Sequence, residues 1–237
     1  MADTYITCDI GRLSDYTAIS VIQVKFYDSK LVVGGVPEVS FDPRDVIPVF
    51  EVSLLERFQA GYRATLQRLQ QIHDIPALFI CDREILIDAT GVGDAVLEMS
   101  REMHMDVTPI SITGGDNAHY GEDRFYVPRT DLIDALVVAI QSRRLRISPD
   151  LDSRLTEQLN IEMNNLQIKR NPTTAKESYD AMIDAKHDDM AMSLAMGIWK
   201  GMQDHQREIT YQENTDQHFG PSGAGAEPDW ANWGLNG

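Results

Sequence analysis

The chain has 237 residues, of which 43% are hydrophobic, enough for one globular domain with a large core. Its 37 acidic and 21 basic residues give a net charge of −16, which argues against a protein that coats nucleic acid through a broad basic surface. Cys8 and Cys81 both stand in apolar runs, so we expect free thiols in a reducing compartment rather than a disulfide framework.

The first part of the chain is predicted to be rich in strands. β-branched and apolar residues at 4–10 and 17–26 predict the two strands of a hairpin. Further strands are expected at 31–36 and 46–56. Apolar residues at helical spacing then predict a helix over 56–73.

Strands and helices alternate in the rest of the chain. Strands are expected at 84–90, 107–113, 145–147 and 168–170, and helices at 94–104, 130–144 (capped by Thr130), 151–166 and 186–202. A hairpin followed by such units predicts an α/β fold with a mixed sheet flanked by helices. We place one domain at 1–203. Residues 204–237 carry six acidic residues, one basic residue and several glycines, and are expected to form a disordered tail.

Four aspartates stand at strand ends or at a helix start. Asp9 ends the first strand in CDIG, and Asp88 ends a later one in IDATGVGD. Asp188 and Asp189 open the last helix, HDDMAMSLAMGIW, whose other residues are mostly apolar. Each aspartate alone is also typical of a turn or helix cap. Because strand ends gather at one edge of an α/β sheet, we expect the four carboxylates to converge.

Converging carboxylates repel one another, and a divalent cation removes that conflict. An oxygen-only ligand set selects hard ions such as Mg²⁺ or Mn²⁺, and a pair of these ions promotes hydrolysis of phosphodiesters. The sequence offers no cysteine–histidine cluster with zinc spacing, no GxSxG motif and no Walker A motif.

The sequence resembles the nuclease domain of the large terminase subunit of tailed bacteriophages, which has an RNase H-like fold. Four segments carry the resemblance, in the order of that family: DIGRLSDYTAI (9–19), LIDATGVGD (86–94), VPRTDLIDALVVAIQSRRLRI (127–147) and HDDMAMSLAMGIW (187–199). It implies a metal-dependent endonuclease that cuts concatemeric viral DNA during genome packaging. The catalytic ligands of two Mg²⁺ or Mn²⁺ ions would then be Asp9, Asp88, and Asp188, Asp189 or both.

The resemblance also implies supporting residues. Asp15 matches a recurrent acidic position of the first motif of the family. Gly91 and Gly93 would let the backbone approach the site closely. His187 would either touch the site or lie solvated at the helix end.

The expected main partner is double-stranded DNA. Candidate DNA contacts are the basic residues Arg124, Arg129, Arg143, Arg144, Arg146, Lys169 and Arg170, the last five in a segment that is expected to form a flap. Because the sequence lacks a motor motif, the resemblance implies an ATPase domain on a separate chain or one that was removed, with the small terminase subunit and the portal as further partners. Without a signal peptide or a membrane-spanning run, we expect the host cell cytoplasm and no membrane contact.

Two other functions remain open. In the actin and sugar-kinase superfamily, an Asp-x-Gly turn with a nearby threonine binds nucleotide phosphate, and Asp9, Gly11 and Thr17 fit this pattern loosely. A non-catalytic docking module of the packaging assembly, with its aspartates acting as caps and surface charges, would agree with the net charge of −16.

Overall fold

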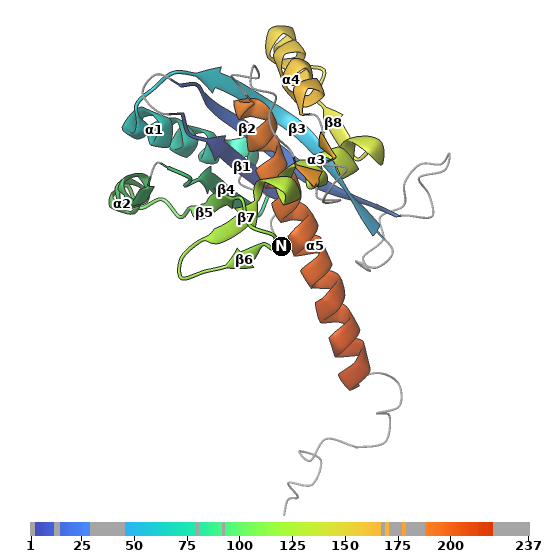
Figure 1. The fold of residues 1–237 in the computed structure, drawn as a ribbon. Coiled ribbons are helices and arrows are strands. Elements are labelled where there is room, and N and C mark those ends of the chain that lie inside the picture. Colours follow the sequence, from blue (N-terminus) through green and yellow to red (C-terminus); the bar gives the residue numbers. More distant parts are fainter. Residues whose placement is uncertain are drawn as a thin grey trace, which may run out of the picture.

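The computed structural model describes residues 3–11, 15–28, 46–78, 81–91, 93–166, 169–170, 177–178 and 188–219. An eight-stranded mixed sheet lies at the centre of this part of the chain, in the order β6-β7-β5-β4-β1-β2-β3-β8 (Figure 1). Its strands are β1 (Thr4–Asp9), β2 (Thr17–Asp28), β3 (Val46–Phe58), β4 (Arg83–Asp88), β5 (Thr108–Thr113), β6 (His119–Tyr120), β7 (Phe125–Pro128) and β8 (Leu145–Ile147). The short strands β9 (Lys169–Arg170) and β10 (Glu177–Ser178) pair separately.

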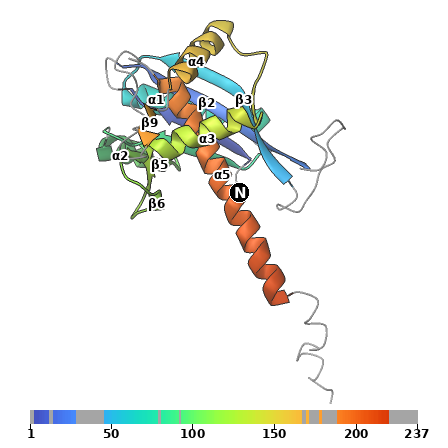
Figure 2. The ribbon, with the colours of Figure 1, turned by 45° about the vertical axis from the view of Figure 1, so that its right-hand side comes forward.

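Helices cover both faces of the sheet. They are α1 (Tyr62–His73), α2 (Gly93–Glu102), α3 (Arg129–Gln141), α4 (Ser153–Asn165) and α5 (Asp189–Phe219). One core lies between the sheet and α1 with α2, and the other between the sheet and α3, α4 and α5. Figure 2 shows α3 and α5 crossing on the same side of the sheet.

The alternation of side chains along the strands produces these two cores. In β1, Tyr5 faces the core of α5, whereas Ile6 and Cys8 belong to the core of α1 and α2. The antiparallel pair β1–β2 and the parallel pair β1–β4 confirm the predicted mixed α/β sheet.

The first predicted helix begins later than its spacing suggests. It was expected over 56–73 but starts at Tyr62, because β3 continues to Phe58, which pairs with Thr17 across the sheet. The predicted strand at 31–36 lies outside the described residues.

The expected helix cap at Thr130 is wrong. Helix α3 starts one residue earlier, at Arg129, directly after Pro128, and no side chain caps it. The Thr130 hydroxyl instead donates to the Asp131 carboxylate at 3.5 Å.

Helix α5 continues past residue 203, where the domain was expected to end. Packing explains the difference, because Asp204 accepts a hydrogen bond from the Tyr5 hydroxyl at 2.7 Å and so ties this turn to the sheet. The helix then projects beyond the sheet as far as Phe219 (Figure 1). Residues 220–237 of the expected tail lie outside the described part of the chain, in which no helix has the length and apolarity to cross a membrane.

Small side chains let α5 lie close to the sheet. At Gly197, an added Cβ would stand 2.6 Å from Ile22 Cδ1 and 2.9 Å from Thr7 Cγ2. These distances are below van der Waals contact, so a larger residue would push the helix away from the strand that ends in Asp9.

Candidate active site

Two of the predicted aspartates end neighbouring parallel strands. Cys8 of β1 pairs with Ile87 of β4, so Asp9 and Asp88 follow side by side at the carboxyl ends of the two strands. Because Cys8 and Ile87 face the core of α1 and α2, alternation turns both aspartates toward the face that α5 covers.

The other two aspartates lie at the start of α5. Asp188 directly precedes the helix and Asp189 is its first residue. Glu162 of α4, which is 1% exposed, accepts hydrogen bonds through Oε2 from the N–H groups of Met190 at 3.0 Å and Ala191 at 3.1 Å. Glu162 therefore occupies helix donors that a capping aspartate would otherwise satisfy.

Asp9 is the aspartate on which the charges of the other three act. Burial raises the pKa of Asp9 well above its usual range, and the charges of the other three aspartates raise it further. Among these charges, Asp88 has the largest effect on the pKa of Asp9, followed by Asp189 and then Asp188, while Arg129 lowers it. The fold thus gathers the predicted acids from three separate elements.

Hydrogen bonds fix the loop after Asp88. The Thr90 N–H donates to Asp88 Oδ1 at 2.7 Å, and the Thr90 hydroxyl accepts from the Ile112 N–H at 2.6 Å. Burial raises the pKa of Asp88, against the lowering effect of the Thr90 hydrogen bonds. Gly91 has a φ of 74°, a left-handed conformation that favours glycine, and Gly93 begins α2.

Two arginines pair with the aspartates of α5. Arg129, the first residue of α3, forms an ion pair with Asp188. Arg57 near the end of β3 donates to Asp189 at 3.2 Å, and its guanidinium carbon lies 4.0 Å from the centre of the Tyr16 ring. The site therefore contains two positive groups among its four negative ones.

Two neighbours of the aspartates were not predicted from the sequence. Arg57 lies in the stretch LLERF, where a strand was expected to pass into a helix, and Glu162 lies in a helix with an ordinary charged face. Only the pairing of distant segments brings them to the aspartates, so no local pattern could have identified them.

The oxygen ligands that the four aspartates offer are of the kind that bind a hard divalent cation. They are carboxylate oxygens, the ligands that Mg²⁺ and Mn²⁺ prefer. Among the described residues, however, no three acidic, histidine or cysteine side chains already form a metal-ligand arrangement. The ion pairs explain this, because Asp188 and Asp189 direct oxygens toward Arg129 and Arg57.

The roles predicted for the remaining residues stay predictions. Asp15 is exposed in the turn before β2, and His187 lies outside the described residues. For Lys169 and Arg170, the structure describes only the backbone of β9.

Arg143, Arg144 and Arg146 do not join the aspartates. The Arg146 guanidinium lies over the ring of Tyr27, with 5.1 Å to its centre. Tyr27 is near the far end of β2 from Thr17, about 30 Å along the strand. The three arginines therefore lie at the opposite end of the sheet from the four carboxylates.

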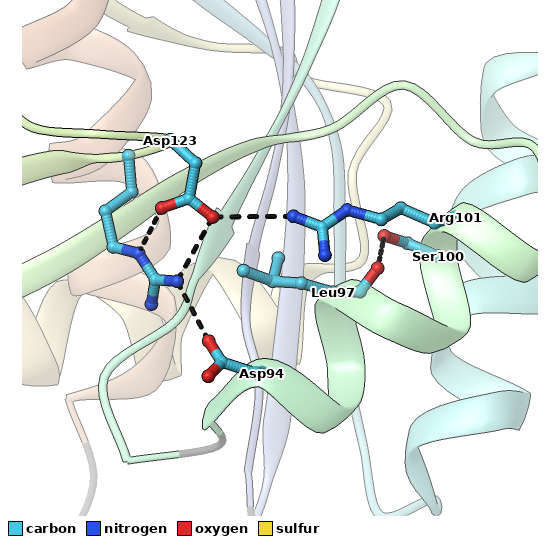
Figure 3. A network of polar contacts seen from close by, with 6 residues as sticks. Asp94, Leu97, Ser100, Arg101 and Asp123 are labelled. Atoms are coloured by element: carbon cyan, nitrogen blue, oxygen red, sulfur yellow. Dashed lines mark hydrogen bonds and ion pairs between the residues drawn. The ribbon is translucent and has the colours of Figure 1, made fainter.

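Arg124 is engaged in a network of ion pairs (Figure 3). Its guanidinium contacts Asp94 Oδ1 at 2.9 Å and Asp123 Oδ1 at 2.8 Å, and Arg101 also reaches Asp123 at 3.4 Å. The network joins the turn between β6 and β7 to α2, so Arg124 helps to position these elements. Its predicted contact with DNA stays a prediction.

No protein-family model matches the sequence, and no curated protein sequence matches it. Among solved structures, the large terminase nuclease of the thermophilic phage G20c is 18% identical, with a TM-score of 0.51, over 82% of this chain and 80% of that one. The same nuclease with bound zinc is 18% identical, with a TM-score of 0.47, over 82% and 79% of the two chains. The manganese-soaked human cytomegalovirus terminase nuclease domain is 13% identical, with a TM-score of 0.47, over 87% and 86%.

The first of these matches shows the fold. The mixed sheet with helices on both faces is that of a large terminase nuclease, as the sequence resemblance predicted.

Proposed function

We propose that the chain is a divalent-metal-dependent DNA endonuclease that cuts concatemeric viral DNA during genome packaging. The observation that carries this proposal is the convergence of aspartates from β1, β4 and α5. Asp9 and Asp88 end adjacent parallel strands. Arg57 is in register with Asp9 across β2, because both pair with Ala18. Arg57 also forms an ion pair with Asp189 of α5. The structural likeness to a phage large terminase nuclease supports the same reaction and the same viral setting.

Asp9 and Asp88 would hold the cations from the sheet, and Asp189, together with Asp188, from the helix. Asp189 pairs with Arg57, which lies in register with Asp9 across β2, and this placement favours Asp189 as a direct ligand. Two bound Mg²⁺ or Mn²⁺ ions would supply activation of water and stabilisation of the negative charge that develops on the phosphodiester.

The protein residues would prepare this site in two ways. The Thr90 N–H donates to Asp88 Oδ1 and so fixes the orientation of that carboxylate. Glu162 fixes the first turn of α5 through Met190 and Ala191, and so fixes where Asp189 starts.

The nucleotide-binding alternative gains no support from the geometry. Thr17 is fully buried, and its hydroxyl accepts a hydrogen bond from the Gly11 N–H at 3.1 Å. This hydroxyl therefore closes the turn after Asp9 and does not face outward to a phosphate. The docking module is the outcome that the experiment below must separate from the nuclease.

The test is cleavage of supercoiled plasmid by the purified chain with Mn²⁺, Mg²⁺ or EDTA. Wild type is expected to nick and linearise the plasmid only with metal, and Asp88→Asn is expected to lose this activity. The exposed Asp150 provides a matched control, since Asp150→Asn removes the same charge outside the cluster. Equal activity of wild type and Asp88→Asn would indicate a contaminating nuclease. No cleavage, together with no Mn²⁺-induced rise in Tm, would favour the docking module.

A further inference from the structure

Each of the adjacent aspartates at the start of α5 is paired with an arginine from another element. Arg129 of α3 pairs with Asp188, and Arg57 of β3 pairs with Asp189. The Arg57–Asp189 pair is largely shielded from solvent, with side chains that are 13% and 18% exposed. The Arg129–Asp188 pair is only partly shielded, with side chains that are 33% and 22% exposed. The two guanidinium groups thus compensate part of the negative charge of the site.

This compensation competes with metal binding. A carboxylate oxygen that accepts from a guanidinium is occupied, and the positive guanidinium repels a divalent cation nearby. Cation binding and arginine–aspartate pairing therefore weaken each other, and the coupling is equal in both directions.

Arg57 has hydrogen-bonding capacity that Asp189 does not use. Its Nε is buried and has no hydrogen-bond partner among the described residues. A buried, charged N–H group without a partner is unfavourable, so an acceptor is expected there in the working state. The Tyr16 ring would keep the guanidinium in place after Asp189 is withdrawn, and a guanidinium fork matches the oxygens of a phosphate.

We propose that Arg57 and Arg129 hold Asp189 and Asp188 in the metal-free protein and transfer to a DNA phosphate when a divalent cation takes the carboxylates. This inference rests on the proposed endonuclease function. On this inference, each of the two arginines weakens the binding of metal and strengthens the binding of DNA. A purely structural ion pair would not produce this combination.

The test measures the two ligands separately, without cleavage. Mn²⁺ is titrated calorimetrically into wild type, Arg57→Gln and Arg129→Gln in the absence of DNA, and both variants are expected to bind Mn²⁺ about fivefold more tightly or better. The same proteins are then titrated with a short DNA duplex in Ca²⁺, where both variants are expected to bind about tenfold more weakly. Arg68→Gln is the matched control, because Arg68 pairs with Glu56, next to Arg57 in β3, and is expected to change neither affinity.

Arg57→Lys separates charge from shape. It keeps the positive charge but loses the guanidinium fork, so Mn²⁺ affinity should stay near wild type while DNA affinity falls. If Arg57→Gln does not fold, Arg57→Lys and Arg129→Gln decide the question. Unchanged or weaker Mn²⁺ binding by the glutamine variants that fold overturns this inference and leaves the nuclease proposal standing. A wild type that binds no Mn²⁺ overturns both.

Discussion

The hydroxyl of Ser193 in α5 lies 2.9 Å from the hydroxyl of Thr7 in β1 and donates to the Thr7 carbonyl at 3.2 Å. Ser20 of β2 completes this buried cluster, with its hydroxyl 2.7 Å from each of the other two. Ser193 stands about one turn after Asp189, and Thr7 stands two residues before Asp9. The cluster therefore fixes how α5, which carries Asp189, is rotated about its axis relative to β1, which carries Asp9.

Replacing Ser193 with alanine is expected to lower the free energy of unfolding by about 1–2 kcal/mol, because buried hydroxyls lose a partner. Urea denaturation measures this loss. Ser142→Ala is the exposed control, since the Ser142 hydroxyl donates to the Val138 carbonyl of α3 and accepts from Arg144 Nε at 2.9 Å outside the core. Equal losses in the two variants would contradict a special role of the buried cluster.

The two adjacent aspartates are expected to differ in importance. Asp189 pairs with Arg57, which is in register with Asp9. Asp189→Asn should therefore lower the rate of plasmid cleavage about 100-fold and Asp188→Asn only about 10-fold. Cleavage rates under single-turnover conditions test this order. A larger loss in Asp188→Asn would make Asp188 the direct ligand.

The sequence predicted those parts of the fold that local patterns determine. The hairpin of β1 and β2 follows from two apolar runs around a polar turn, and the strand that ends in Asp88 follows from an apolar run before glycines. The four aspartates were predicted as metal ligands because each stands at such a boundary, and that role stays a prediction. Their convergence then followed from the topology of the α/β sheet.

Tertiary contacts decided what the sequence could not show. Residue 204 looks like the start of a polar tail, yet Asp204 lies on a helix because Tyr5, a distant residue of β1, donates to it. Arg57 reaches the site because β3 extends beyond its apolar stretch to pair with Thr17 and its neighbours. Neither contact leaves a signal in the surrounding residues.

Glu162 is expected to make stability depend on pH. The pKa of this carboxyl is raised from an ordinary 4.5 to about 7, mainly by burial and in smaller part by the charge of Asp189, against the lowering effect of the Ala191 N–H hydrogen bond. Because the folded state binds the proton more tightly, this contribution to stability is complete below about pH 4.5 and is lost as the pH rises through about 7. The loss is expected to reach about 2–3 kcal/mol.

Glu162→Gln isolates this effect, because the amide keeps an acceptor for the helix N–H groups but does not titrate in this range. We expect the variant to gain stability relative to wild type between pH 5 and pH 8, in urea denaturation with EDTA present. If the difference in free energy of unfolding between the variant and wild type does not change with pH, or changes in the opposite direction, Glu162 is not the source of the pH dependence.

Lys200 is expected to be the most important cation for stability at the end of the sheet away from the aspartates. Its side chain is 8% exposed and lies 2.8 Å from Glu84 and 2.6 Å from Asp204. Lys200→Met leaves two acids without their cation and should lower the free energy of unfolding by about 3 kcal/mol, without changing Mn²⁺ affinity. Lys25→Met is the matched control, because Lys25 pairs with Glu51 on the surface with 45% of its side chain exposed, and should cost less than about 1 kcal/mol. If both variants lose a similar free energy of unfolding, burial does not strengthen the ion pairs of Lys200.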